Sequence, residues 1–88
     1  MARVVMYMTG SCGYCHAAER LLEKKGFRDI ERIRVDLAPA RRAEMRARSG
    51  RTTVPQIWID GRHIGGCDEL YELEHEGALG RLLETERT

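Results

Sequence analysis

The sequence lacks the features that mark membrane proteins and disulfide-rich secreted proteins. Its 88 residues contain no apolar run close to the length needed to cross a bilayer. Three cysteines are too few for a disulfide framework, and the N-terminus does not show the charged and then apolar pattern of a secretory signal. We therefore expect a soluble protein of the reducing cytoplasm, with no membrane partner.

An excess of charge of one sign is also missing. The chain has 15 basic and 14 acidic residues and a formal net charge of +1, so no overall field attracts it to nucleic acid. Arginines do gather between positions 41 and 51, and we interpret most of them as the solvent-facing side of a short helix. With 42% hydrophobic and 33% charged residues, and with no repeat or linker, residues 1–88 are expected to form one small globular domain.

The apolar pattern predicts secondary structure in the order β-α-β-α-β-β-α-α. Strands are predicted over residues 4–8, 30–35, 56–59 and 62–64. Helices are predicted over residues 12–26, 40–49 and 68–77, followed by a short helix that contains residues 79–83. In the second helix only Ala43, Met45 and Ala47 are available for burial, and the polar tail 84–88 is expected to fray.

The connections between these elements predict a mixed sheet. A crossover helix joins the first two strands, which makes them parallel. Asp60-Gly61 between the last two strands is a strong signal for a two-residue hairpin, which makes that pair antiparallel. We therefore predict an α/β fold with a four-stranded mixed sheet flanked by helices.

The most informative motif is Cys12-Gly13-Tyr14-Cys15, which follows the first predicted strand. Two cysteines at this spacing exchange disulfides or hold a metal. Cys12 lies at the predicted start of a helix, where unpaired backbone N–H groups and the helix dipole favour a thiolate over a thiol. The dipole supplies at most about 2 kcal/mol, so direct N–H···S bonds or a nearby cation must add to it. Cys12 is then the exposed, attacking thiol, and Cys15, one turn further along, resolves the mixed disulfide.

A structural zinc site is the competing interpretation of the cysteines. The spacing of Cys12, Cys15, His63 and Cys67 is acceptable for zinc. We rank it below disulfide exchange because His63 falls in a predicted strand, and because zinc would leave the segment Thr53-Val54-Pro55 without a role.

That segment has two interpretations of its own. Pro55 fits the start of a strand, where its missing N–H does least harm. It fits equally a cis peptide bond, which would turn the chain and leave the N–H and C=O groups of Val54 free to pair with an extended peptide.

Taken together, three motifs resemble the glutaredoxin family, and most closely its bacterial glutaredoxin 3 type. They are C-G-Y-C after a strand, T-V-P before the hairpin and G-G-C-D at the start of the third helix, in matching order and spacing over residues 12–68. The stretch from Arg48 to Ile57 also matches that type. The resemblance implies a thioredoxin-like fold and an enzyme of cellular redox homeostasis and electron transport, which reduces protein–glutathione mixed disulfides and protein disulfides with electrons from glutathione.

The resemblance also implies roles for individual residues. Catalysis would fall to Cys12 as nucleophile and Cys15 as resolving thiol, in a protein that acts as a monomer. Glutathione would be bound by Tyr14 at the rim, by Thr53, Val54 and a cis Pro55 around its cysteinyl part, and by Gly66, Cys67 and Asp68 at its γ-glutamyl end. For Asp68 the alternative is a plain helix-capping role.

Two positions depart from the family pattern. Many relatives carry a lysine three residues before the first cysteine, where this chain has Thr9, so we expect a cation from elsewhere, with Arg41 or Arg42 as candidates. Gly13 replaces the proline of the commoner dithiol motif. Among glutaredoxins this glycine is associated with a [2Fe-2S] cluster, bridged between two subunits by their first cysteines and two glutathiones. A cluster carrier or sensor, with Cys12 as ligand in a dimer, is therefore the alternative function.

Overall fold

The structure, a computed structural model, describes residues 3–85, with side chains described as far as Leu82. It has eight elements, in the predicted order: β1 Arg3–Met8, α1 Gly13–Lys24, β2 Asp29–Arg34, α2 Pro39–Ser49, β3 Gln56–Ile59, β4 Arg62–Gly65, α3 Cys67–His75 and α4 Ala78–Thr85. Of the tail that was expected to fray, residues 84 and 85 belong to α4, and residues 86–88 lie outside the described part. No helix in that described part is long and apolar enough to span a membrane.

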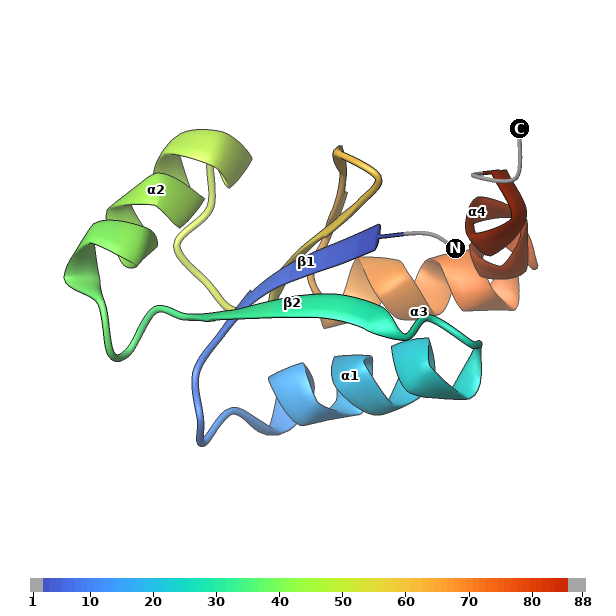
Figure 1. Ribbon diagram of the computed structural model, residues 1–88, viewed down its shortest axis with the longest axis horizontal. Helices are drawn as coiled ribbons and strands as arrows, with labels where there is room; N and C mark the ends of the chain where they lie inside the picture. Colours follow the sequence, from blue (N-terminus) through green and yellow to red (C-terminus); the bar gives the residue numbers. More distant parts are fainter. Residues whose placement is uncertain (1–2, 86–88) are drawn as a thin grey trace.

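The four strands form one mixed sheet in the order β2-β1-β3-β4. β1 and β2 are parallel, while β3 is antiparallel to both β1 and β4. Asp60 and Gly61 both have positive φ, 51° and 81°, as a tight two-residue hairpin requires. Figure 1 shows α1 and α3 along one side of the sheet and α2 on the other. The mixed sheet and the thioredoxin-like fold are thus as predicted.

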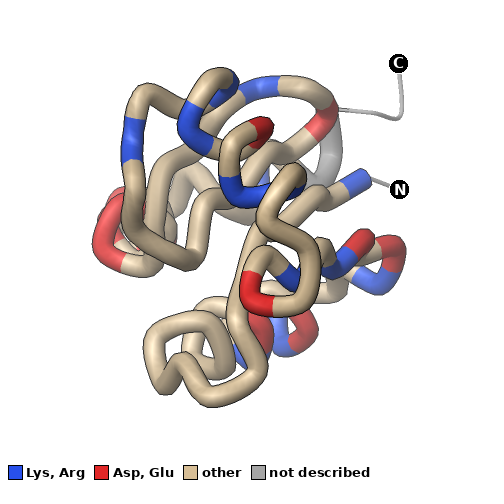
Figure 2. The backbone as a smooth tube through the Cα atoms, turned by 90° about the vertical axis from the view of Figure 1, so that its left-hand side faces the viewer, with Lys and Arg blue, Asp and Glu red and all other residues tan. Residues whose placement is uncertain are grey.

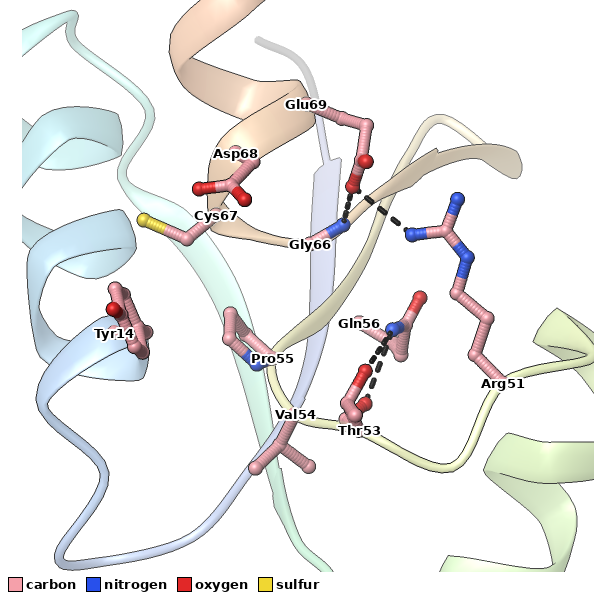
Figure 3. Close-up of a pocket in the computed structure, with 10 residues that line it drawn as sticks. All are labelled: Tyr14, Arg51, Thr53, Val54, Pro55, Gln56, Gly66, Cys67, Asp68 and Glu69. Carbon is pink, nitrogen blue, oxygen red and sulfur yellow. Dashed lines mark hydrogen bonds and ion pairs between the residues drawn. The ribbon is translucent and has the colours of Figure 1, made fainter.

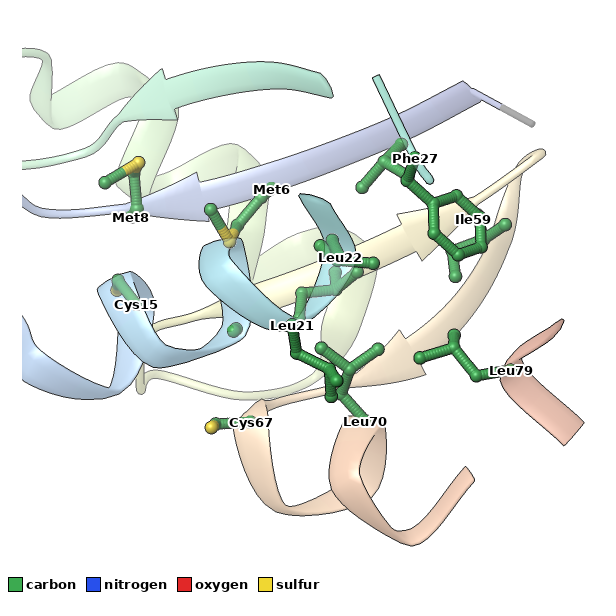
Figure 4. Packing of buried hydrophobic residues seen from close by; sticks show 13 residues of the cluster. Met6, Met8, Cys15, Leu21, Leu22, Phe27, Ile59, Cys67, Leu70 and Leu79 are labelled. Atoms are coloured by element: carbon green, nitrogen blue, oxygen red, sulfur yellow. The ribbon is translucent and has the colours of Figure 1, made fainter. Parts of the chain in front are cut away.

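The face toward α1, α3 and α4 holds the larger core. Alternate residues of the two central strands point to this face, among them Val4 and Met6 of β1 and Ile57 of β3. They pack against Leu21 and Leu22 of α1 and against apolar residues of α3 and α4 (Figure 4). The thiols Cys15 and Cys67 lie at one end of this core, next to the sheet end from which the site is built.

The face toward α2 holds a smaller core of Tyr7, Ile33, Val35, Met45 and Trp58. Of the three α2 residues predicted to be buried, only Met45 is; Ala43 and Ala47 are exposed. The prediction was wrong for the two alanines because α2 meets the sheet through a single buried side chain.

The arginines of and beside α2 are accompanied by acidic groups. Arg41 pairs with Glu44 at 3.0 Å, and Arg51 pairs with Glu69 at 3.0 Å. Charges of both signs occur on the side of the molecule that Figure 2 shows. Two of the five arginines in this cluster are therefore neutralised by ion pairs where they lie.

Candidate active site

Cys12 is the N-cap of α1. Its backbone is extended, with φ −87° and ψ 114°, and its Sγ accepts a hydrogen bond from the backbone N–H of Cys15 at 3.1 Å. The sulfur therefore takes the position that a Ser, Thr or Asp oxygen occupies in an ordinary N-cap. Because Cys12 is only partly buried, this sulfur is both accessible and in contact with one of the unpaired N–H groups expected at a helix start.

Cys15 differs from Cys12 in its surroundings, although it is only one helical turn away. Its side chain is fully buried in the core between α1 and the sheet. Burial, together with the contact to Cys12, raises the pKa of Cys15 to about 12. The two cysteines are thus an unequal pair, one accessible and one protected and held as a neutral thiol at neutral pH.

The loop before β3 lies against Cys12. The peptide bond between Val54 and Pro55 is cis, as the resemblance implies. The Cys12 Sγ lies 3.9 Å from the carbonyl oxygen of Val54, which is 42 positions away in the chain. The fold therefore brings the C-G-Y-C and T-V-P motifs into contact.

The start of α3 supplies backbone donors to the same region. Its N-cap is Gly66, whose N–H already donates to the Glu69 Oε1 at 2.6 Å. Cys67 and Asp68 follow in the first turn, where backbone N–H groups have no acceptor within the helix. Since the N-cap position belongs to Gly66, the structure disfavours the capping alternative for Asp68, and its exposed carboxylate is available to a ligand.

Gly65 is required just before this helix. Its φ is 117°, which side-chain-bearing residues rarely adopt, and a Cβ here would meet the Glu69 carboxylate at 2.6 Å. The double glycine therefore lets Glu69 reach back to the N-cap.

These segments enclose a pocket of about 300 Å³, which is at the lower end of the range for small-molecule sites (Figure 3). All seven residues predicted to bind glutathione line it: Tyr14, Thr53, Val54, Pro55, Gly66, Cys67 and Asp68. Tyr14 lies on one side of the pocket and Arg51 on the other, with Pro55 between them.

Sequence reasoning missed three further lining residues, Arg51, Gln56 and Glu69. Arg51 is also the one cation among the lining residues, whereas Arg41 and Arg42, the candidates from the sequence, do not line the pocket. The Gly66 N–H, and then Arg51, lower the pKa of Glu69, so this carboxylate is ionised at neutral pH. A Glu three residues after Gly66 was the available signal for its capping contact.

The zinc interpretation does not fit this geometry. The Nε2 of His63 is 2.8 Å from the Gln56 Oε1, and its ring stacks on Trp58, on the α2 face of the sheet. Cys15 and Cys67 belong to the core on the opposite face. Within residues 3–85, no group of three or more His, Cys, Asp or Glu side chains could hold a metal ion.

The exposure of the cysteines limits how this chain could hold an iron–sulfur cluster. Of the three free cysteines, Cys12 is partly exposed, while Cys15 and Cys67 are buried. One accessible thiol does not complete the coordination of a cluster. Any cluster would therefore need its other ligands from outside this chain.

An accessible cysteine that caps a helix, backed by a buried second cysteine on a thioredoxin-like sheet, defines a thiol–disulfide oxidoreductase. The glutaredoxin family model matches residues 4–64 of this chain. The chain belongs to the glutaredoxin family.

Individual relatives agree with this assignment. Glutaredoxin 3 of Escherichia coli strain K12 is 52% identical over 83 residues, covering 94% of this chain and 99% of that protein. The solution structure of a glutaredoxin from Brucella melitensis superposes with a TM-score of 0.84 at 48% identity, over 98% of this chain and 92% of that one. A buckwheat glutaredoxin–glutathione complex superposes with a TM-score of 0.87 at 32% identity, over 96% of this chain and 78% of that one.

Proposed function

We propose that residues 1–88 act as one domain and, as a cytoplasmic monomer, use glutathione to reduce protein–glutathione mixed disulfides and protein disulfides. The observation that carries the proposal is the 3.9 Å approach of the Cys12 Sγ to the Val54 carbonyl oxygen, beside a pocket with peptide-binding groups. The buckwheat relative in complex with glutathione, at 32% identity, supports the choice of ligand.

The pocket offers partners for the cysteinyl and γ-glutamyl parts of glutathione. The cysteinyl residue would pair with the N–H and C=O groups of Val54 in the manner of an added strand. The γ-glutamyl carboxylate would accept from the backbone N–H groups of Cys67 and Asp68, at the positive end of α3. The γ-glutamyl ammonium would meet the Asp68 carboxylate, and Tyr14 would cover the rim.

With this binding mode, deglutathionylation needs only Cys12. Its thiolate attacks the glutathione sulfur of the mixed disulfide, the bond to the substrate protein breaks, and the released protein thiolate takes a proton from water. A second glutathione thiolate then attacks the glutathione sulfur bound to Cys12. Glutathione disulfide leaves, and the Cys12 thiolate is restored.

Reduction of a protein disulfide also needs Cys15. After Cys12 has formed a mixed disulfide with the substrate, Cys15 attacks the Cys12 sulfur, releases the second substrate thiol and forms a Cys12–Cys15 disulfide. Two glutathione thiolates then reduce this disulfide in turn, and glutathione disulfide leaves. Burial and the contact with Cys12 both raise the pKa of Cys15. Once the Cys12 sulfur is in a disulfide it carries no charge, so its electrostatic contribution to the raised pKa of Cys15 is lost. Cys15 is therefore easier to deprotonate at the stage at which it must act.

The test measures turnover of a glutathionylated peptide, with glutathione and glutathione reductase, for the parent, Cys12→Ser and Cys15→Ser. We expect activity to fall at least about 1,000-fold in Cys12→Ser, because a serine hydroxyl is not ionised at neutral pH. Cys15→Ser should retain deglutathionylation but lose reduction of a protein disulfide. Arg62→Ala, at an exposed position outside the pocket lining, serves as the control.

Two results would contradict the proposal. If the parent protein is inactive in this assay, glutathione is not its reductant. Loss of deglutathionylation in Cys15→Ser would show that the division of work between the two thiols is wrong.

A further inference from the structure

Gln56 is a polar residue inside the structure. It is 1% exposed, at the start of β3, and is the one polar residue among the buried side chains of the described part. Its Nε2 donates to the Thr53 carbonyl oxygen at 3.0 Å, and its Oε1 lies 2.8 Å from the Nε2 of His63. Both ends of the amide are therefore used, as burial of a polar group requires.

These contacts fix the direction of each hydrogen bond. A carbonyl oxygen only accepts, so the Gln56 amide must turn its NH₂ toward Thr53 and its oxygen toward His63. The Nε2 of His63 must then carry a hydrogen and donate it. Burial, and next the nearby Arg51, lower the pKa of His63, so at neutral pH it is the neutral ring with the hydrogen on Nε2 that fills this role.

His63 is itself held in place on the α2 face. It is the cross-strand partner of Trp58, and the two ring centroids are 4.6 Å apart. The Arg48 guanidinium in turn lies over the Trp58 ring, 4.5 Å from its centroid. Hydrogen bonds and ring contacts thus run without a break from α2 to the Thr53 carbonyl.

Fixing the Thr53 carbonyl also fixes a group in the pocket. The peptide unit from Thr53 to Val54 is planar and trans, since the cis bond of this loop is the next one along. In a trans unit the C=O and the following N–H point in opposite directions. Because Gln56 holds the Thr53 C=O toward its own buried amide, the Val54 N–H of the same unit points away from that amide. Val54 itself lines the pocket.

We propose that Gln56 and His63 are positioning residues, which orient the Val54 N–H so that it can bind an extended thiol peptide. The inference rests on the proposed function, in which the cysteinyl part of glutathione pairs with Val54. Neither residue needs to touch the reacting sulfur atoms. They act through the Thr53–Val54 peptide unit, and the expected effect is therefore on substrate binding.

The test compares the parent with Gln56→Leu, Gln56→Glu and His63→Phe. Gln56→Leu removes both hydrogen bonds, Gln56→Glu keeps an acceptor for His63 but loses the donor to Thr53, and His63→Phe keeps the ring on Trp58 but loses the donor. Arg62→Ala, in the same hairpin with an exposed side chain, is the matched control.

Steady-state kinetics with a glutathionylated peptide separate KM from kcat. The rate at which iodoacetamide alkylates Cys12 measures the reactivity of this thiol and does not depend on glutathione binding. We expect KM to rise about tenfold in Gln56→Leu and Gln56→Glu and about threefold in His63→Phe. The kcat and the alkylation rate should stay within about twofold of the parent, and Arg62→Ala should match the parent throughout. The Val54 amide signal in ¹H–¹⁵N spectra should shift in the three variants and not in the control.

Each other outcome has a defined meaning. If the parent turns over the peptide and all variants keep the parental KM, the positioning role is wrong while the proposed function stands. A fall in alkylation rate in step with kcat/KM would indicate general loss of structure, and this too would overturn the positioning role. If the parent does not turn over the peptide, the proposed function fails, and the inference that rests on it fails with it. His63→Phe keeps the test decisive where a Gln56 variant does not fold.

Discussion

The two faces of the sheet are built on different principles. The face toward α1, α3 and α4 buries thirteen residues in one cluster, all of them apolar or thiol side chains. The face toward α2 buries five, and its contacts are directional. There the Tyr7 hydroxyl donates to Glu44 and accepts from the Arg48 guanidinium at 2.8 Å, and Arg48 also stacks on Trp58.

The two faces therefore contribute differently, one mainly to stability and the other mainly to the orientation of side chains. Apolar burial is non-directional and scales with area, so the larger face is the main source of stabilisation. Hydrogen bonds and ring contacts add less net free energy but define orientation. The pocket lies where the two faces meet, because, among its lining residues, Cys67 belongs to the first face and Gln56, which contacts His63, to the second.

The largest expected effect comes from breaking the apolar face. Phe27 is fully buried there, beside Leu22 and Ile59 (Figure 4). Phe27→Ala should lower the free energy of unfolding by about 3–5 kcal/mol, because it removes a large side chain and leaves a cavity. Urea denaturation measures this change. The control is Leu37→Ala, since Leu37 is 72% exposed, and a loss there as large as at Phe27 would contradict the comparison.

A smaller effect is expected on the α2 face. Tyr7→Phe keeps the ring against Trp58, at 5.3 Å between centroids, but removes the hydroxyl that joins Glu44 and Arg48. We expect a loss of about 1–2 kcal/mol in the free energy of unfolding, since both partners are charged groups. If Tyr7→Phe costs as much as Phe27→Ala, the α2 face is not the weaker one.

The Tyr7 variant should also change how stability depends on pH. The hydrogen bond from Tyr7, and next the one from Arg41, lower the pKa of Glu44 in the folded protein. A lowered carboxyl pKa contributes stability above the unfolded value of about 4.3, and that contribution is lost as the pH falls through the folded value. The difference in free energy of unfolding between the parent and Tyr7→Phe should therefore become smaller as the pH falls from about 6 to about 3, as measured by urea titrations. An equal gap at both pH values would argue against this coupling.

The smallest predicted effect lies at the junction of the faces. Glu69→Ala removes the acceptor of the Gly66 N–H and the partner of Arg51. We expect about 0.5–1 kcal/mol less stability in thermal unfolding, as for the loss of a helix cap. KM for a glutathionylated peptide should stay within about threefold of the parent, because the first-turn N–H groups remain. Glu72→Ala, on the same helix, is the matched control, and a loss of activity in Glu69→Ala alone would give Glu69 a direct role.

Local signals were sufficient to predict the elements and their order. Asp60-Gly61 sets its own hairpin through the backbone freedom of two residues, and Cys12 lies four positions after the end of β1, where a helix begins. Both depend on neighbours within a few positions. Burial on α2 could not be predicted in the same way, because Ala43 and Ala47 depend on how that helix lies against the sheet.

The candidate site likewise has one part that local motifs predict and another that depends on how the strands pair. The seven glutathione-binding residues implied by family resemblance all line the pocket, since they are carried by continuous motifs. The contact between Gln56 and His63 depends on the β3–β4 register, which pairs Trp58 with His63. Tyr7 and Trp58 meet only because β1 pairs with β3. The sequence shows no other aromatic residue next to Trp58, so this ring contact could not be predicted from its neighbours in the chain.

The order of the strands also determines how the protein behaves among other copies of itself. β2 and β4 are the edge strands, and exposed edges are where β-sheets add strands from neighbouring molecules. β4 has only four residues and ends at a glycine, while β2 carries Glu31 and Arg32, which form ion pairs with Arg3 and with Glu19 and Glu23. A short edge and a charged edge both discourage edge-to-edge aggregation, so the sheet is protected on its two open sides without a covering helix.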